Sequence, residues 1–254
     1  MKKPIIVVGM GELGSVLARG FLKLGYPVQA VTREMNMVQI AENYPDPHAV
    51  LIAVGEGDIH QVMQDIPHPW QKDSILLQNE LLPRDWKETD LLEPTVISVW
   101  FEKKKGMDSK VVLPSPVYGK HARLVFDALA KLDLPSYIVD TQEELEYELV
   151  RKNLYILTTN IAGLECGGNV MHLKENHPEL LQDVVKDVLT LQSSLVGHEL
   201  DSDKLMEGML EAFSGDPEHG CMGRSAPIRL ARALNIAHDL GIELPTLQKI
   251  QNKH

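Results

Sequence analysis

The apolar residues of the first 140 positions gather in short runs rich in Val and Ile, separated by segments whose apolar residues recur with a helical period. Short runs of this kind predict parallel strands that are covered on both faces. The expected strands are 5–8, 28–31, 50–54, 75–77, 96–100, 111–113 and 137–139, and the clearest helices are 13–24 and 120–132. This alternation predicts a doubly wound parallel α/β domain.

Positions 141–254 have few such runs and instead show helical periodicity. Helices are expected at 142–163, 178–195, 201–213, 226–240 and 244–251. Asp201 or Ser202 can cap the third of these helices, and Gly241 suits the position that follows the fourth. The change of pattern near Asp140 predicts two domains, 1–140 and 141–254, of which the second is all-α.

The charge is unevenly divided between these two parts. The 254-residue chain has a formal net charge of −11, with 18 acidic and 15 basic residues in 1–140 and 18 acidic and 10 basic residues in 141–254. This balance argues against nucleic-acid binding. No apolar run approaches the roughly 20 residues of a membrane-spanning helix. Two cysteines are too few for a disulfide scaffold, which favours a cytoplasmic protein.

The segment between the first expected strand and the first expected helix fits the pattern G-x-G-x-x-G. Its residues are Gly9, Met10, Gly11, Glu12, Leu13 and Gly14. The first glycine of this pattern allows a tight turn, the second lets backbone approach a pyrophosphate, and the third lets helix and strand pack closely. The helix N-terminus adds free N–H groups and the positive end of its dipole. We therefore expect these six residues to bind a dinucleotide; a tight turn without a ligand is the alternative.

The end of the second expected strand carries the residues that choose between NAD and NADP. An acidic residue there bonds the ribose 2′-hydroxyl of NAD, but this chain has Thr32 and Arg33. Thr32 cannot repel a 2′-phosphate, and the guanidinium of Arg33 can grip one. These two residues predict NADP. The alternative is that Arg33 is solvated and Glu34 turns towards the ribose, which would favour NAD.

Polar side chains at two further places are candidates for a site. Asn79 follows the fourth expected strand and offers both a donor and an acceptor, either to a nicotinamide ribose or substrate or to its own turn. Lys152, Ile156 and Asn160 share one face of the long helix 142–163. There, Lys152 could protonate an alkoxide and Asn160 could orient a substrate. Alternatively, Lys152 reaches solvent past its apolar neighbours and Asn160 bonds backbone.

With these motifs the chain resembles the ketopantoate reductase (2-dehydropantoate 2-reductase) family. The resemblance covers most of the length and includes the glycine motif, Thr32-Arg33, Asn79, Lys152 with Asn160, and Gly223-Arg224. It implies a Rossmann domain followed by a helical domain of the 6-phosphogluconate dehydrogenase C-terminal type, and NADPH-dependent reduction of a 2-keto acid. By resemblance, Arg33 matches the 2′-phosphate arginine, Asn79 the cofactor-contacting and substrate-contacting Asn, Lys152 the catalytic Lys and Asn160 a substrate-binding Asn.

The chain also departs from this family. Ile156 stands where the family has a second Asn, Pro227 stands in place of a C-terminal Glu, and Asn79-Glu80 replaces an Asn-Gly step. The stretch 33–50 is too short for the extra strand typical of the family. The chain is accordingly identified as a divergent member.

The sequence thus predicts an NADP-dependent oxidoreductase that acts on a small 2-keto acid, with Lys152 and Asn160 as catalytic residues and a homodimer as a candidate assembly. A non-catalytic NADP-binding sensor, or a related β-hydroxyacid or imine reductase, is the alternative. The segment 218–221 holds a His and a Cys without a second ligand cluster, so no metal site is expected.

Overall fold

The computed structural model describes residues 2–77, 79–91 and 93–253. The chain divides into two compact units, Met1–Glu148 and Leu149–His254. The first unit contains a sheet with helices on both faces, and the second is helical. The units are therefore described one after the other.

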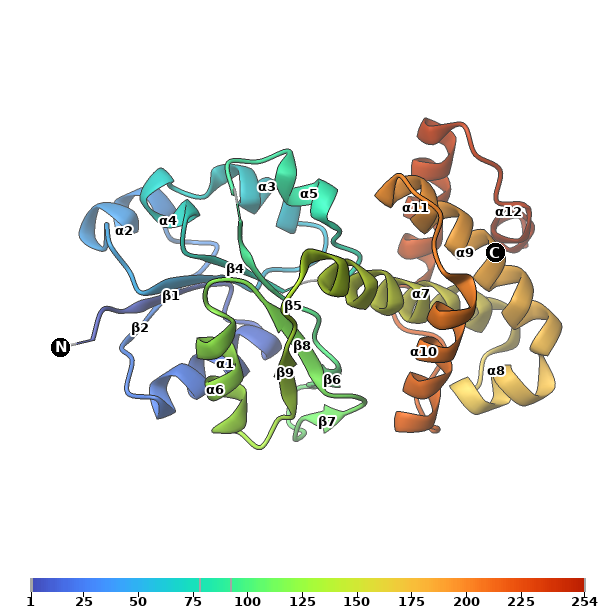
Figure 1. Cartoon of the computed structure of the whole chain (residues 1–254), viewed down its shortest axis with the longest axis horizontal. Helices are drawn as coiled ribbons and strands as arrows, with labels where there is room; N and C mark the ends of the chain where they lie inside the picture. Colours follow the sequence, from blue (N-terminus) through green and yellow to red (C-terminus); the bar gives the residue numbers. More distant parts are fainter. Residues whose placement is uncertain (1, 78, 92, 254) are drawn as a thin grey trace. The chain divides into compact units, whose positions relative to one another are not determined.

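Within the described residues, seven strands of the first unit form one sheet in the order β2-β1-β3-β4-β5-β8-β9 (Figure 1). Their bounds are β1 Ile5–Val8, β2 Val28–Val31, β3 Ala49–Ile52, β4 Ser74–Leu76, β5 Thr95–Ile97, β8 Ser115–Tyr118 and β9 Ser136–Ile138. Strands β1 to β5 are parallel, whereas β8 pairs antiparallel with β5 and parallel with β9. The predicted fold class is confirmed as a mostly parallel, Rossmann-like sheet with a helical C-terminal part.

The strand order reverses between β1 and β3, because the chain passes from β1 to β2 on one side and then returns to the other side for β3. In open α/β sheets, such a switch point leaves a crevice at the carboxyl ends of the strands where ligands bind. The short stretch after β2 contains helix α2 (Met37–Asn43) and no strand in its described residues, as its length predicted.

The prediction that residues 111–113 form a strand of the main sheet is wrong. Residues Lys110–Val111 form β7, which pairs with β6 (Phe101–Glu102) in a separate two-stranded ribbon. The strand that enters the sheet is β8, which contains Pro116. Proline lacks the N–H that a central strand uses, so the sequence pattern argues against a strand there. The carbonyl of Pro116 nevertheless accepts a hydrogen bond from the Ser98 N–H at 3.1 Å.

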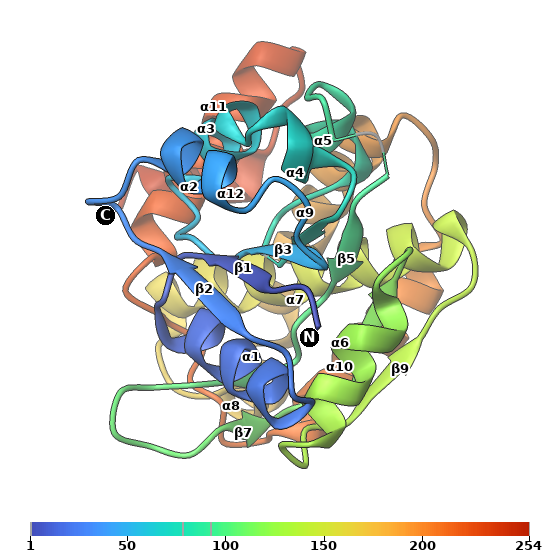
Figure 2. The same ribbon diagram turned by 90° about the vertical axis from the view of Figure 1, so that its left-hand side faces the viewer.

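Burial of apolar side chains explains the strands and the helices that flank them. All four residues of β1 are buried. Helices α1 (Glu12–Lys23) and α6 (Ala122–Ala130) cover one face, and α2, α3 (Ile59–Asp65), α4 (His68–Gln71) and α5 (Pro83–Lys87) lie over the other (Figures 1 and 2). Phe21 and Leu17 of α1 are fully buried in the core cluster. Each such side chain contributes about 1.5–3 kcal/mol on burial.

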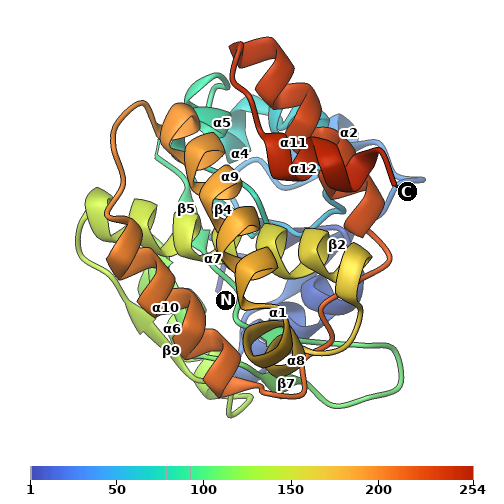
Figure 3. The same ribbon diagram turned by 90° about the vertical axis from the view of Figure 1, so that its right-hand side faces the viewer.

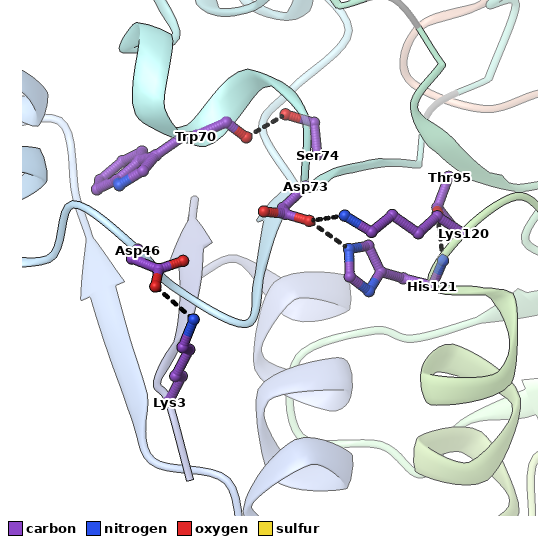
Figure 4. A network of polar contacts seen from close by, with 8 residues as sticks. All are labelled: Lys3, Asp46, Trp70, Asp73, Ser74, Thr95, Lys120 and His121. Atoms are coloured by element: carbon purple, nitrogen blue, oxygen red, sulfur yellow. Dashed lines mark hydrogen bonds and ion pairs between the residues drawn. The ribbon is translucent and has the colours of Figure 1, made fainter.

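A network of hydrogen bonds connects residues at the amino edge of the sheet (Figure 4). The buried carboxylate of Asp73 accepts hydrogen bonds from Lys120 Nζ at 2.5 Å and from His121 Nε2 at 3.0 Å. The His121 N–H donates to Thr95 Oγ1 at 2.8 Å. Burial would raise the pKa of Asp73, but these two hydrogen-bonded neighbours hold it below its usual range. Burial lowers the pKa of His121 in spite of the nearby carboxylate.

The second unit consists of helices, and its described residues contain no strand (Figure 3). The helices are α7 Gln142–Cys166, which begins in the first unit, α8 Val170–Asn176, α9 Pro178–Val196, α10 Ser202–Gly215, α11 Ala226–Leu240 and α12 Pro245–Gln251. Asp201 caps α10, because its side chain accepts the N–H of Lys204 at 3.0 Å. Gly241 ends α11 in the left-handed conformation, with φ of 67°. Both features were predicted, whereas α8 was not.

A buried carboxylate holds the last helix. Asp187 of α9 is 4% exposed, and its Oδ2 accepts the N–H groups of Thr246 at 2.7 Å and Leu247 at 3.0 Å. These N–H groups belong to the first turn of α12, where backbone N–H groups have no acceptor within their own helix. Burial raises the pKa of Asp187 although these two hydrogen bonds oppose the shift. A side chain of α9 therefore fixes the start of α12.

Candidate nucleotide site and polar groups of the long helix

The turn between β1 and α1 has the geometry that its three glycines imply. Gly9 has φ of +92°, and a Cβ added to it would lie 2.5 Å from the carbonyl oxygen of Ala53. A Cβ added to Gly14 would lie 2.0 Å from the carbonyl oxygen of Gly9. A Cβ added to Gly11 would meet no atom within 4 Å. The fold itself thus requires two of the glycines, whereas Gly11 borders open space.

The N-terminus of α1 opens into the same space. The helix begins at Glu12, and its N-cap is Gly11, which has no side chain to bond the first-turn N–H groups. These N–H groups and the positive end of the helix dipole are suited to bind an anion.

Among the other motif residues, Met10 is exposed and borders the space, whereas Leu13 packs against the core. The Glu12 carboxylate lies 3.4 Å from Lys103 Nζ.

A cleft of about 520 Å³ lies at the carboxyl ends of β1, β2 and β3. It is lined by Val8, Gly9, Met10, Gly11, Val31, Thr32, Arg33, Glu34, Met35, Met37, Ala53, Val54, Gly55 and Val62. It coincides with the switch point of the sheet, where α/β proteins of this type bind nucleotides. The structure therefore brings the glycine turn together with Thr32 and Arg33.

Two carboxylates bind Thr32 and Arg33, and one of them, Glu34, lines this cleft. Thr32 Oγ1 donates a hydrogen bond to Glu34 Oε2 at 2.7 Å. That hydrogen bond lowers the pKa of Glu34, so the side chain carries its charge at neutral pH. Arg33 Nη2 donates to Asp58 Oδ2 at 2.6 Å, and the Arg33 side chain is 85% exposed. Sequence reasoning missed Asp58, although it directly follows Gly55-Glu56-Gly57 after β3, and glycines at the carboxyl end of a strand suit the rim of a ligand site.

Asn79 follows β4, and its side chain forms a hydrogen bond with the loop after β3. Its Nδ2 donates to Glu56 Oε1 at 3.1 Å, and Glu56 lies in the loop after β3. The next residue, Glu80, has φ of 67°, which is unusual for a residue other than glycine. The structure therefore places Asn79 at the carboxyl edge of the sheet, but not among the residues that line the 520 Å³ cleft.

Lys152 and Asn160 belong to the second unit and share one face of α7. Lys152 Nζ lies 5.6 Å from the centre of the Tyr155 ring. Asn160 is 8% exposed, and its Oδ1 accepts a hydrogen bond from Arg229 Nη1 at 2.9 Å. A Cβ added to Gly223 would lie 3.3 Å from the same oxygen. The side-chain carbonyl of Asn160 is thus engaged by Arg229 of α11.

Arg229 was missed in the sequence, although a signal was present. It is a buried residue of α11. Its buried neighbours on the same helix are Ala226, three residues before it, Leu230, directly after it, and Ala233, four residues after it. An arginine is unusual at a position where the helical period predicts a buried apolar residue, because charged side chains are rarely buried. Pro227, in contrast, is exposed in the first turn of α11, where proline is well tolerated.

Metal-binding clusters and membrane spans are both absent from the part of the chain that the structure describes. In residues 2–77, 79–91 and 93–253, no group of three or more His, Cys, Asp and Glu side chains is arranged to hold a metal ion. Among the helices in these same ranges, none combines the length and the apolar character needed to cross a membrane.

Comparison with solved structures identifies the fold. A 2-dehydropantoate 2-reductase from Methylococcus capsulatus superposes with a TM-score of 0.70 at 12% identity, covering 98% of this chain and 95% of that one. A dimeric ketopantoate reductase from Staphylococcus aureus gives 0.65 at 14% identity, with 98% and 96% covered. D-mandelate dehydrogenase in complex with NADH gives 0.67 at 15% identity, with 99% and 97% covered.

Comparison of whole sequences does not detect this likeness. No family model matches the chain, and no curated protein matches it. The resemblance to ketopantoate reductases that the motifs indicated is nevertheless confirmed at the level of the fold, since several structures of that family align with nearly the whole chain.

Proposed function

We propose that this chain is an NADP-dependent oxidoreductase that reduces a small 2-keto acid to the 2-hydroxy acid. The observation that carries the proposal is the glycine turn. Gly9 and Gly14 are required by the turn, and Gly11 borders the cleft at the switch point of the sheet. The fold likeness to two reductases and one NADH-bound dehydrogenase supports the same reaction class.

The residues of the cleft suit a dinucleotide. Backbone N–H groups at the start of α1 would hold the pyrophosphate, and Arg33 would bind the 2′-phosphate through its planar fork. A bound nicotinamide would supply a hydride to the carbonyl carbon of the substrate. Asn79, at the ends of β3 and β4, would bond the cofactor or the substrate through its amide.

Lys152 is the proposed proton donor. Protonation of the carbonyl oxygen as the hydride arrives converts the ketone to an alcohol and leaves Lys152 as a neutral amine, which solvent reprotonates. Asn160 would orient the substrate through its amide N–H₂, since its carbonyl accepts from Arg229. Both roles are proposed from the shared face of α7 and from the family resemblance.

The test is a titration followed by a turnover screen. NADPH fluorescence should change on mixing with the protein, and a panel of 2-keto acids should then show consumption of NADPH. Lys152→Ala should abolish turnover and leave NADPH affinity unchanged, whereas Lys186→Ala, at an exposed position of α9, should change neither. No change in fluorescence with NADPH or NADH would refute the proposal, and retained turnover in Lys152→Ala would remove this residue as the donor.

A non-catalytic NADP-binding sensor is the second candidate. It is favoured by the bond between Asn160 and Arg229, which occupies the carbonyl of the proposed substrate-binding residue. Binding of NADPH without turnover across the whole panel would support the sensor over the enzyme.

We further propose a cytoplasmic homodimer that binds a small molecule. The dimeric ketopantoate reductase among the similar folds supports the oligomeric state. Light scattering coupled to size-exclusion chromatography tests it, and a mass close to the 28.4 kDa of one chain would refute it.

A further inference from the structure

The ion pair between Arg33 and Asp58 links two loops at the rim of the nucleotide cleft. Arg33 follows β2, and Asp58 follows β3 as the N-cap residue of α3. An Asp at an N-cap commonly accepts a backbone N–H of its own helix. Asp58 makes no such side-chain bond, and its Oδ2 instead accepts from Arg33 Nη2 at 2.6 Å. The carboxylate is therefore directed towards the arginine and not towards its own helix.

The pair is open to solvent on both sides. The Arg33 side chain is 85% exposed, and the Asp58 side chain is 47% exposed. Exposed pairs of this kind are weak and exchange readily with other partners. Arg33 also lines the cleft, so it can turn to a bound anion once it leaves the carboxylate.

A second carboxylate lies next to Arg33 in sequence and lines the same cleft. Glu34 stays ionised, because Thr32 donates a hydrogen bond to it. A carboxylate at this position accepts bonds from ribose hydroxyls and repels a 2′-phosphate. The rim therefore combines one cation that favours NADPH with two anions that oppose it.

We propose that Asp58 is a specificity-determining residue that limits the preference of this site for NADPH over NADH. The proposal rests on the proposed function, because it assumes that the cleft binds a nicotinamide dinucleotide. A 2′-phosphate must compete with Asp58 for the guanidinium of Arg33. NADH carries a hydroxyl at the same place and leaves the ion pair intact. Asp58 thus lowers the affinity for NADPH and has no effect on NADH.

The experiment measures the dissociation constants of NADPH and NADH by fluorescence for the full chain and its variants. Asp58→Asn keeps the size of the side chain and removes its charge. It should raise the affinity for NADPH by about two- to fivefold, the upper part of the range expected for release of an exposed charged partner, and change the affinity for NADH less than twofold. Asp65→Asn is the matched control, since Asp65 ends the same helix and accepts a hydrogen bond from Gln61, one turn before it.

A double-mutant cycle shows whether the effect passes through Arg33. In an Arg33→Ala background, Asp58→Asn should leave the ratio of the two affinities unchanged. The same gain in that background would assign the effect to direct repulsion and overturn the proposal. An unchanged or weaker NADPH affinity in the single variant would also overturn it, because Asp58 would then position Arg33 for the phosphate. If the unaltered protein binds neither nucleotide, the proposed function fails first, and this inference fails with it.

Discussion

Replacement of Gly14 and Gly11 by alanine separates the role of the turn in folding from its role in binding. The two glycines are three residues apart in one motif, yet their surroundings differ. A methyl group at Gly14 would lie 2.0 Å from the carbonyl oxygen of Gly9, whereas one at Gly11 would meet no atom within 4 Å. We expect Gly14→Ala to destabilise the first unit and Gly11→Ala to weaken nucleotide binding alone.

The size of the first effect follows from the required displacement. Cβ atoms in proteins essentially never approach another heavy atom within 3.0 Å, so the turn and α1 must separate by at least 1.0 Å. The obstacle is backbone, which cannot rotate away as a side chain can. Overpacking costs about 1–3 kcal/mol, and we expect about 3 kcal/mol here. For a unit of this size, each kcal/mol lowers the melting temperature by about 2–4 °C, which gives a decrease of about 6–12 °C.

The effect of Gly11→Ala on stability should be small, because two terms oppose each other. Alanine is a poorer N-cap than glycine by up to about 1 kcal/mol. It also reduces the entropy of the unfolded chain, which contributes about 0.4–1 kcal/mol of stability. The melting temperature should therefore change by about 2 °C or less. The methyl group, however, occupies the space where a pyrophosphate would approach, and NADPH affinity should fall by at least about tenfold.

Calorimetry without nucleotide and fluorescence titration with NADPH provide the two readouts. If Gly14→Ala melts at the same temperature as Gly11→Ala, the steric account of the turn is incorrect. If Gly11→Ala binds NADPH as tightly as the unaltered chain, the nucleotide does not approach the turn at this residue.

Three further predictions concern other parts of the molecule. Asp187→Ala removes the acceptor for the Thr246 N–H and should destabilise the second unit by about 1–2 kcal/mol, whereas Asp187→Asn, which keeps an oxygen, should cost less in urea unfolding. Burial lowers the pKa of His121 below its ordinary 6.5, so the unfolded chain takes up the proton first as the pH falls. Stability that is present at pH 7.5 should decline towards pH 5, and His121→Gln should flatten this decline; an equal decline in both proteins would speak against it. Glu80→Gly should raise stability by about 1 kcal/mol in the same assay, because φ of 67° suits glycine.

Features that depend on local spacing could be predicted from the sequence. The apolar run of β1, the three glycines and the periodicity of α1 lie within twenty residues of one another, so local spacing alone is enough to predict the glycine turn between this strand and this helix. Helix ends with their own chemical signal, such as Asp201 and Gly241, were predicted for the same reason.

Features that depend on contacts between distant segments could not be predicted in this way. Strand β8 contains Pro116, and its place beside β5 comes from pairing across some twenty residues. The partner of Arg33 lies 25 residues away, and the partner of Asn160 lies 69 residues away. Spacing along the chain indicates which residue types are suited to a site, but only the folded chain shows which groups already bind one another there.

The backbone of Glu80 has a consequence for any substitution at this turn. A residue with a side chain costs about 1–2 kcal/mol in the left-handed conformation, and glycine avoids that cost. The chain nevertheless has glutamate there, directly after Asn79 at the carboxyl edge of the sheet. A substitution at position 80 therefore changes two properties at once. Glycine would release the backbone cost and would also remove a carboxylate from the carboxyl edge of the sheet.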